Sequence, residues 1–325
     1  MIGRLARRAA VVLLSLAAVG CLGRTTDSRA PIDIGAPGAW SVHRPMPTAR
    51  QEVAVAVLAG RIFVIGGFGA LAEPVPTVEV YDPGTDLWET RAPLPAPTHH
   101  PAAAVIGDRL FVVGGYTGGR VNWTPQRVLY EYDAARDSWA TRAAMPTARG
   151  ALGAAALNGR LHAVGGAHTS PTAAHEVYDP QTDRWSGLAP MPTARDHLAV
   201  VVFDGRLWAI GGRAAFLREQ YPAVEIYDST ADRWDAGVPL PTGRGGLAAA
   251  AAGGRIFVFG GEAPLKIFSA TEMFEPASQR WIAKDPMRTP RHGIGAVVVG
   301  RRIWISGGGT EPGYAPTSAN EAFTP

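Results

Sequence analysis

Two short features recur along this chain at the same irregular spacing. Both series are separated by 48, 51, 46, 49 and 47 residues, in that order. Composition alone does not make two residue types share a varying period, so the chain consists of six related units. Glycine pairs begin at Gly66, Gly114, Gly165, Gly211, Gly260 and Gly307, and single tryptophans lie at Trp40, Trp88, Trp139, Trp185, Trp234 and Trp281.

Each unit has the pattern of four short strands. In the first unit, Gln51–Leu58 is rich in Val and Ala, Ala59-Gly60 suits a hairpin turn, and an apolar run follows up to the glycine pair. A loop of variable length leads to a third strand that ends in Tyr81, and Trp88 opens a fourth. Four antiparallel strands in each unit predict an all-β fold in which every unit is one propeller blade.

The glycine pair, the Tyr-Asp-Pro segment and the tryptophan at these spacings resemble the kelch repeat. The resemblance covers residues 38–325 and implies a six-bladed β-propeller. The sixth unit has only one strand after its glycine pair, whereas Trp40 opens a strand that has no blade before it. We therefore expect the Trp40 strand to complete the last blade, which leaves no open sheet edge.

The first 21 residues predict export. Arg4, Arg7 and Arg8 precede a twelve-residue apolar run that is too short to span a bilayer. Residues 18–21 resemble a bacterial lipobox, with Ala18 where leucine is usual and Cys21, the only cysteine, at the lipidation position. We expect a lipoprotein anchored in the periplasm or on the outer surface; a secreted soluble protein is the alternative. Residues 22–37 predict a flexible tether to the propeller.

The charge balance argues against a nucleic-acid partner. The chain has 31 Lys and Arg against 28 Asp and Glu, and the excess equals the three arginines of the leader. The remaining chain is neutral and lacks the basic footprint that binding to DNA or RNA requires. The resemblance to kelch propellers implies instead a protein, a peptide or a glycan as the partner.

The candidate site lies on the face that carries the variable loops after the glycine pairs and the starts of the innermost strands. Sixteen residues before the glycine pairs an arginine recurs in five units, and Thr98 takes this position in the second. A ring of guanidinium groups would suit a carboxylate or another anion; alternatively, each arginine pairs with backbone carbonyls or a neighbouring acid. The candidate ligand-binding residues are Arg50, Arg149, Arg195, Arg244, Arg291, His99, His197, His292, Glu52, Tyr116, Trp123 and Tyr314.

Metal and cofactor chemistry finds little support in the sequence. His99, His100, His197 and His292 begin innermost strands, but no pair has a spacing typical of metal ligands, so we predict no metal and no cofactor. Kelch-type propellers include the galactose oxidases, whose copper site needs a Cys–Tyr crosslink. Cys21 lies in the leader, so that chemistry is not expected.

Two functions remain open. We favour a non-catalytic module that binds a glycan, a peptide or a protein at the cell envelope. The alternative is a carbohydrate-acting isomerase resembling the sialic acid mutarotases, which need an acid, a base and an arginine for the sugar carboxylate. Nothing in the sequence selects a catalytic pair. The eligible partners of Arg195 or Arg291 are Glu52, Asp196, His197, Glu262 and His292.

Overall fold

The computed structural model describes residues 38–119, 122–214 and 218–325. The predicted leader with Cys21 and the tether of residues 22–37 lie outside the described residues. Within the described ranges, no helix is long and apolar enough to cross a membrane.

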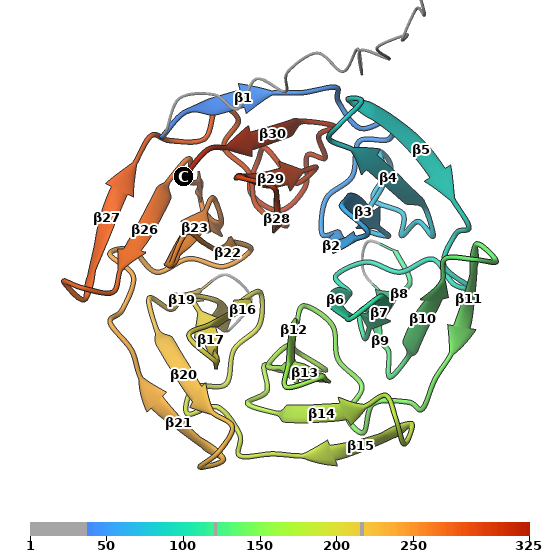
Figure 1. Ribbon diagram of the computed structural model, residues 1–325, viewed down its shortest axis with the longest axis horizontal. Helices are drawn as coiled ribbons and strands as arrows, with labels where there is room; N and C mark the ends of the chain where they lie inside the picture. Colours follow the sequence, from blue (N-terminus) through green and yellow to red (C-terminus); the bar gives the residue numbers. More distant parts are fainter. Residues whose placement is uncertain (1–37, 120–121, 215–217) are drawn as a thin grey trace, which may run out of the picture. The chain divides into compact units, whose positions relative to one another are not determined.

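Six four-stranded antiparallel sheets surround a central axis (Figure 1), which confirms the predicted six-bladed propeller. In each blade the innermost strand comes first in the chain, except that blade 6 takes its outermost strand from the N-terminal side. Blade 1 contains β2 (Ala54–Leu58), β3 (Arg61–Ile65), β4 (Val78–Asp82) and β5 (Leu87–Arg91); blade 2 contains β6 (Ala102–Ile106), β7 (Arg109–Val113), β10 (Leu129–Asp133) and β11 (Ser138–Thr141); blade 3 contains β12 (Gly153–Leu157), β13 (Arg160–Val164), β14 (His175–Asp179) and β15 (Arg184–Gly187).

The second half of the ring repeats this order, and three loops that follow glycine pairs fold into short two-stranded ribbons. Blade 4 contains β16 (Ala199–Phe203), β17 (Arg206–Ile210), β20 (Val224–Asp228) and β21 (Arg233–Ala236); blade 5 contains β22 (Ala248–Ala252), β23 (Arg255–Phe259), β26 (Thr271–Glu275) and β27 (Arg280–Lys284); blade 6 contains β28 (Gly295–Val299), β29 (Arg302–Ser306), β30 (Asn320–Phe323) and β1 (Trp40–Val42). The ribbons are β8 (Tyr116–Thr117) with β9 (Thr124–Pro125), β18 (Arg213–Ala214) with β19 (Glu219–Gln220), and β24 (Glu262–Ala263) with β25 (Lys266–Ile267).

The two ends of the described chain close the ring together, as the unit count predicted. β1 pairs with β30 in antiparallel register, with Trp40 opposite Phe323. The indole of Trp40 lies 5.3 Å from the ring of Phe323, and its Nε1 donates a hydrogen bond to the carbonyl of Asp285 in the neighbouring segment. Closure therefore joins the start of the propeller to its last strand.

In four blades an aspartate and a tryptophan form hydrogen bonds to the segment that precedes the blade, and we call this arrangement the clamp. In blade 3, Asp183 accepts hydrogen bonds from the hydroxyl of Tyr178 at 2.7 Å and from the backbone N–H of Ala143 at 2.9 Å. Trp185 Nε1 donates to the carbonyl of the same Ala143. Asp86, Asp137 and Asp232 repeat this clamp in blades 1, 2 and 4.

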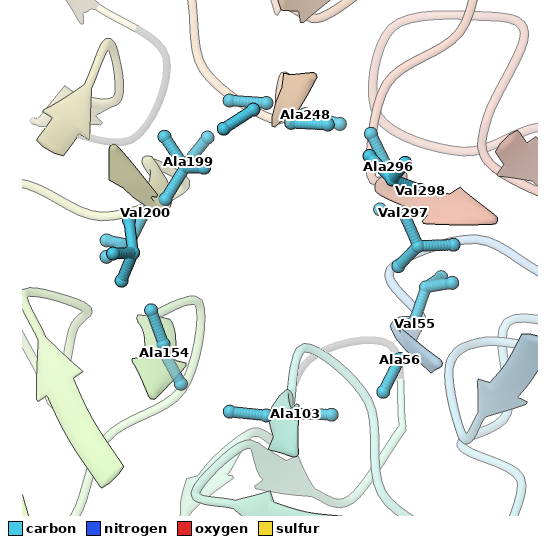
Figure 2. Close-up of a pocket in the computed structure, with 18 of the residues that line it drawn as sticks. Val55, Ala56, Ala103, Ala154, Ala199, Val200, Ala248, Ala296, Val297 and Val298 are labelled. Atoms are coloured by element: carbon cyan, nitrogen blue, oxygen red, sulfur yellow. The ribbon is translucent and has the colours of Figure 1, made fainter. Parts of the chain in front are cut away.

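The hydrophobic core lies between neighbouring blades, and the innermost strands enclose a channel. Six clusters of buried side chains each join two adjacent blades. Figure 2 shows the channel wall, with small side chains such as Val55, Ala103, Ala154 and Val200 around an opening of about 410 Å³. Small residues let the blades converge, and this apolar wall has no reactive side chains, so a reactive site within the channel would lie at one of its ends.

One predicted strand boundary is wrong, and the difference creates the site. The innermost strand of blade 1 begins at Ala54 and not at Gln51. Glu52 has φ of 55°, which is incompatible with a strand, and Gln51 forms an isolated bridge with Phe68. The residues just before the innermost strand therefore form a turn at the end of the channel.

Candidate functional site

The five recurring arginines lie inside the blades. All five guanidinium groups are fully buried, and each forms an ion pair with a glutamate of its blade. Arg195 also donates from Nε to the carbonyl of Gly211 at 2.8 Å and from Nη2 to that of Ala209 at 3.0 Å. The described residues thus form no arginine ring that faces a ligand; the alternative of internal pairing is what is observed. The pairs are Arg50–Glu79, Arg149–Glu176, Arg195–Glu225, Arg244–Glu272 and Arg291–Glu321.

Blade 2 lacks both members of the arginine–glutamate pair. Thr98 replaces the arginine, and at the position of the glutamate, two residues before the aromatic Tyr132, the chain has Tyr130. Both partners are missing from the same blade. A lone buried charge would be costly, and blade 2 leaves none at these two positions.

A closed ring of backbone hydrogen bonds surrounds the axis above the channel. Its members lie two residues after the arginine position, and each N–H donates to the carbonyl of the member in the preceding blade at 2.9–3.0 Å. All six have φ between 52° and 66°. We call this ring the axial collar: Glu52, His100, Ala151, His197, Gly246 and Gly293.

A second tier of residues lies against the collar. The residue directly after each arginine position bridges to the residue directly after each glycine pair. These bridges confirm that the innermost-strand starts and the variable loops share one face. The six bridges are Gln51–Phe68, His99–Tyr116, Gly150–Ala167, Asp196–Arg213, Gly245–Glu262 and His292–Gly309.

Collar, second tier and loops together enclose a cavity of about 430 Å³, which we call the axial pocket. One side is aromatic: the rings of Phe68 and Trp123 lie 5.9 Å apart, and Tyr314 is 6.3 Å from Phe68. The Tyr314 hydroxyl bonds the backbone of Gly69 and Ala72 and so ties the loop of blade 6 to that of blade 1. The lining residues are Gln51, Glu52, Phe68, Ala72, His100, Trp123, Arg213, Glu262, Gly313 and Tyr314.

The floor of the axial pocket is a buried carboxylate between two imidazoles. Glu52 Oε2 lies 3.3 Å from His100 Nε2, and Glu52 Oε1 lies 3.3 Å from His292 Nδ1. Burial alone would raise the pKa of Glu52, but His100, His292 and His197 outweigh this and hold it well below its usual range. Burial lowers the pKa of His100 far below 6.5, whereas Glu52 and Glu262 more than offset burial and raise the pKa of His292. Glu52 is therefore ionised at neutral pH, and His100 is uncharged.

In the wall beside Glu52, hydrogen bonds connect four polar side chains. Arg213 donates from Nη1 to Glu262 and from Nη2 to His197 Nε2, the latter at 2.8 Å. Since Nε2 of His197 accepts, its Nδ1 carries the proton and donates to Asp196 at 2.5 Å. Asp196 also lies 3.5 Å from Arg213. The guanidinium of Arg213 is thus already balanced by two carboxylates.

The predicted site residues other than the five arginines take three positions: they line the axial pocket, lie beside its floor or support it from behind. Glu52, Trp123 and Tyr314 line the axial pocket, and His197 and His292 lie beside its floor. His99 and Tyr116 support it from behind: His99 stacks on Phe68 at 3.9 Å, and the buried Tyr116 donates to the carbonyl of Ala167.

Phe68 and Arg213 were missed by the sequence prediction, and Glu262 was named only as an eligible acid. Each directly follows a glycine pair, so its position in the repeat could have indicated a place in the site. Two groups within the described residues have ligand atoms close enough to share a metal ion, Glu52–His100–His197 and Glu52–Glu262–His292. Their members come from different blades, which is why spacing along the sequence predicted none.

The fold and the axial pocket define a propeller with a ligand-sized site at one end of its channel. The chain belongs to the kelch-repeat family: residues 38–212 match the KLHDC2/KLHL20/DRC7 Kelch-repeats domain, and residues 194–241 match the Kelch motif.

A solved structure of the protein YjhT is similar to this chain, with a TM-score of 0.73 and 18% sequence identity over 86% of this chain and 96% of that one. At this identity the likeness shows the fold alone. No curated protein matches the sequence.

Proposed function

We propose that this protein binds carbohydrate and that a neutral sugar unit occupies the axial pocket. The observation that carries the proposal is the opposition of an aromatic side, Phe68, Trp123 and Tyr314, to a polar floor within about 430 Å³. A sugar ring presents an apolar C–H face that packs on aromatic rings and hydroxyl groups that bond to carboxylates and amides. Glu52 and Gln51 provide such acceptors and donors on the opposite side of the pocket.

The charges of the axial pocket favour a neutral ligand over an acidic one. Glu52 is ionised, and Glu262 is a second carboxylate in the lining. Arg213 is paired with Glu262 and Asp196, and the five recurring arginines are buried within their blades. A ligand carboxylate would thus approach two carboxylates without a free guanidinium from these residues to receive it.

A binding screen tests this proposal. Neutral mono- and disaccharides, peptidoglycan fragments and sialic acid are titrated into the full chain by calorimetry. We expect Trp123→Ala to weaken the binding of a neutral sugar by roughly tenfold or more, because a stacked aromatic contributes about 1–3 kcal/mol. Tyr221→Ala, which removes a loop aromatic outside the pocket lining, is the matched control and should leave affinity unchanged. Preferential binding of acidic sugars, or a Trp123→Ala variant that binds normally, would contradict the proposal.

A second candidate is sugar mutarotation, favoured by the contact between Glu52 and His100, which both line the axial pocket. One ionised carboxylate and one neutral imidazole can serve as base and proton carrier beside a sugar ring. Exchange NMR on any sugar that binds separates the two functions. Anomer exchange that is lost in Glu52→Gln supports an isomerase, and binding without exchange supports a binding module.

The cellular location belongs to the same proposal. We infer from the basic and apolar first 21 residues that the chain is exported and carries a lipid on Cys21. Membrane fractionation of the wild type and of Cys21→Ser tests this. Loss of membrane association in the variant supports lipidation, and an unchanged distribution contradicts it.

A further inference from the structure

One ring nitrogen of His292 faces two carboxylates. His292 Nε2 lies 3.1 Å from the carbonyl of Glu311, which can only accept, so Nε2 carries a proton. Glu52 and Glu262 raise the pKa of this ring and so favour a second proton, on Nδ1, which a metal ion would displace to leave a lone pair there. This fully buried Nδ1 has no partner in hydrogen-bond geometry among the described residues, and it lies 3.3 Å from both Glu52 Oε1 and Glu262 Oε1.

Once that proton is displaced, three electron-rich atoms converge at one buried point. Arg213 balances part of the charge of Glu262, and a proton on His292 Nδ1 would balance Glu52; a divalent cation in the place of that proton would be held by all three side chains. Buried carboxylates are stable only when paired, protonated or bound to a metal. We propose that Glu52, Glu262 and His292 form a binding site for a divalent transition-metal cation.

The distances suit such an ion. Bonds from zinc to histidine nitrogen or carboxylate oxygen are about 2.0–2.1 Å, which in a tetrahedral site sets neighbouring ligand atoms about 3.3–3.4 Å apart. Both distances from His292 Nδ1 are 3.3 Å, and all three ligand atoms lie within 4.8 Å of one another. The site thus needs little rearrangement to accept a cation.

The surroundings hold the three ligands in place, as outer partners do in metal sites. The backbone N–H of Gly313 donates to Glu262 Oε2 at 3.1 Å, and the Glu311 carbonyl orients the ring of His292. A Cβ at Gly293 would lie 2.6 Å from the carboxyl group of Glu52, and one at Gly309 would lie 2.4 Å from His292 Nε2. Glycine at these two positions keeps the space that the ligands occupy.

Two oxygens and one imidazole nitrogen form a donor set for Zn²⁺, Fe²⁺ or Mn²⁺ and not for Cu⁺, which prefers sulfur. Since Glu52 and Glu262 line the axial pocket, the open coordination position would face it. The site does not depend on carbohydrate binding, so it goes beyond the proposed function. The neighbouring group Glu52–His100–His197 is less suited, because His197 Nε2 already accepts from Arg213 and His100 Nδ1 contacts His99.

Zinc titration of the full chain, stripped with EDTA, tests the proposal. Calorimetry and elemental mass spectrometry should show about one Zn²⁺ per chain, and Glu262→Gln and His292→Gln should each weaken binding by roughly tenfold or more. His168→Ala removes an exposed histidine and is the control for adventitious surface binding. Co²⁺ in place of Zn²⁺ should give the visible absorption of a four-coordinate nitrogen and oxygen site.

Each outcome decides the assignment. Absence of stoichiometric zinc in the wild type overturns it, as does stoichiometric binding that both variants retain. Loss in His100→Gln and His197→Gln but not in Glu262→Gln moves the metal to the neighbouring group and also overturns it. Circular dichroism checks each variant for folding; Glu262→Asp, which keeps the charge but shortens the side chain, replaces a variant that fails to fold and should also bind more weakly.

Discussion

At the scale of single residues, truncating one of the buried arginines should lower the stability of the fold measurably. Arg195→Ala leaves Glu225 buried without its partner and the carbonyls of Ala209 and Gly211 without their donors. We expect a loss of about 3–5 kcal/mol in the free energy of unfolding, measured by urea denaturation. In a double-mutant cycle, Arg195→Ala with Glu225→Ala should cost less than the sum of the two single changes.

Blade 2 provides the control for that cycle. Thr98 has no arginine to lose, so Thr98→Ala should change the free energy of unfolding by about 1 kcal/mol or less. Additive costs for Arg195 and Glu225 would show that the two side chains do not act as a pair.

A second test at this scale concerns pH. His162 Nδ1 contacts His175 Nε2 at 2.9 Å, and burial lowers the pKa of His162 to about 4 and that of His175 to about 3, from 6.5. Below pH 6.5 these two histidines bind protons in the unfolded chain but stay neutral in the folded chain until the pH approaches their lowered pKa values. The free energy of unfolding should therefore fall as the pH drops from 6.5 towards 4, by on the order of 3 kcal/mol for His162, and should not change through this residue above pH 6.5.

Urea unfolding of the wild type and of His162→Gln between pH 7.5 and 4.5 measures this effect. Glutamine does not titrate, so the variant should show a shallower fall in stability. Equal slopes for both proteins would exclude the histidine pair as the cause.

At the scale of elements, the clamp around Asp183 predicts a difference between two small substitutions. Asp183→Ala removes the acceptor for both Tyr178 and Ala143, and it places alanine at φ of 53°. Asp183→Asn keeps an acceptor oxygen and suits this left-handed conformation. Thermal or urea unfolding should show a loss of about 2 kcal/mol for the alanine variant and less than about 1 kcal/mol for asparagine. Equal losses would show that the acceptor oxygen contributes nothing.

The elements were also the part of the structure most open to prediction from sequence. Strand order, the hairpin turns and closure by Trp40 follow from alternation, turn residues and the count of units. The turn at Gln51–Val53 does not, because Glu52 takes its left-handed conformation to bond with Gly293 of another blade. Likewise, Glu52, Glu262 and His292 meet only once the ring has closed, and no local spacing records that contact.

At the scale of the whole molecule, closure of the ring depends on β1, a strand of only three residues. Trp40→Ala removes ring contacts with Phe259 and Phe323 and the hydrogen bond to Asp285, at a cost of about 3–5 kcal/mol. Hydrogen exchange should speed up in β28, β29 and β30 together. Trp234→Ala is the matched control, since its strand β21 is continuous with its own blade, and its effect should remain in blade 4. Normal protection of β30 in Trp40→Ala would contradict the role of closure.

The axial collar has a mechanical consequence for the molecule. Its six N–H groups all point the same way around the circle, so the circuit has no first or last member. Widening the circle would lengthen all six hydrogen bonds at once, so the outward movement of any single blade is resisted by the whole ring. We therefore expect the end of the channel to keep its diameter whether the axial pocket is full or empty. Conformational adjustment to different ligands would then occur in the loops after the glycine pairs, which differ in length from blade to blade.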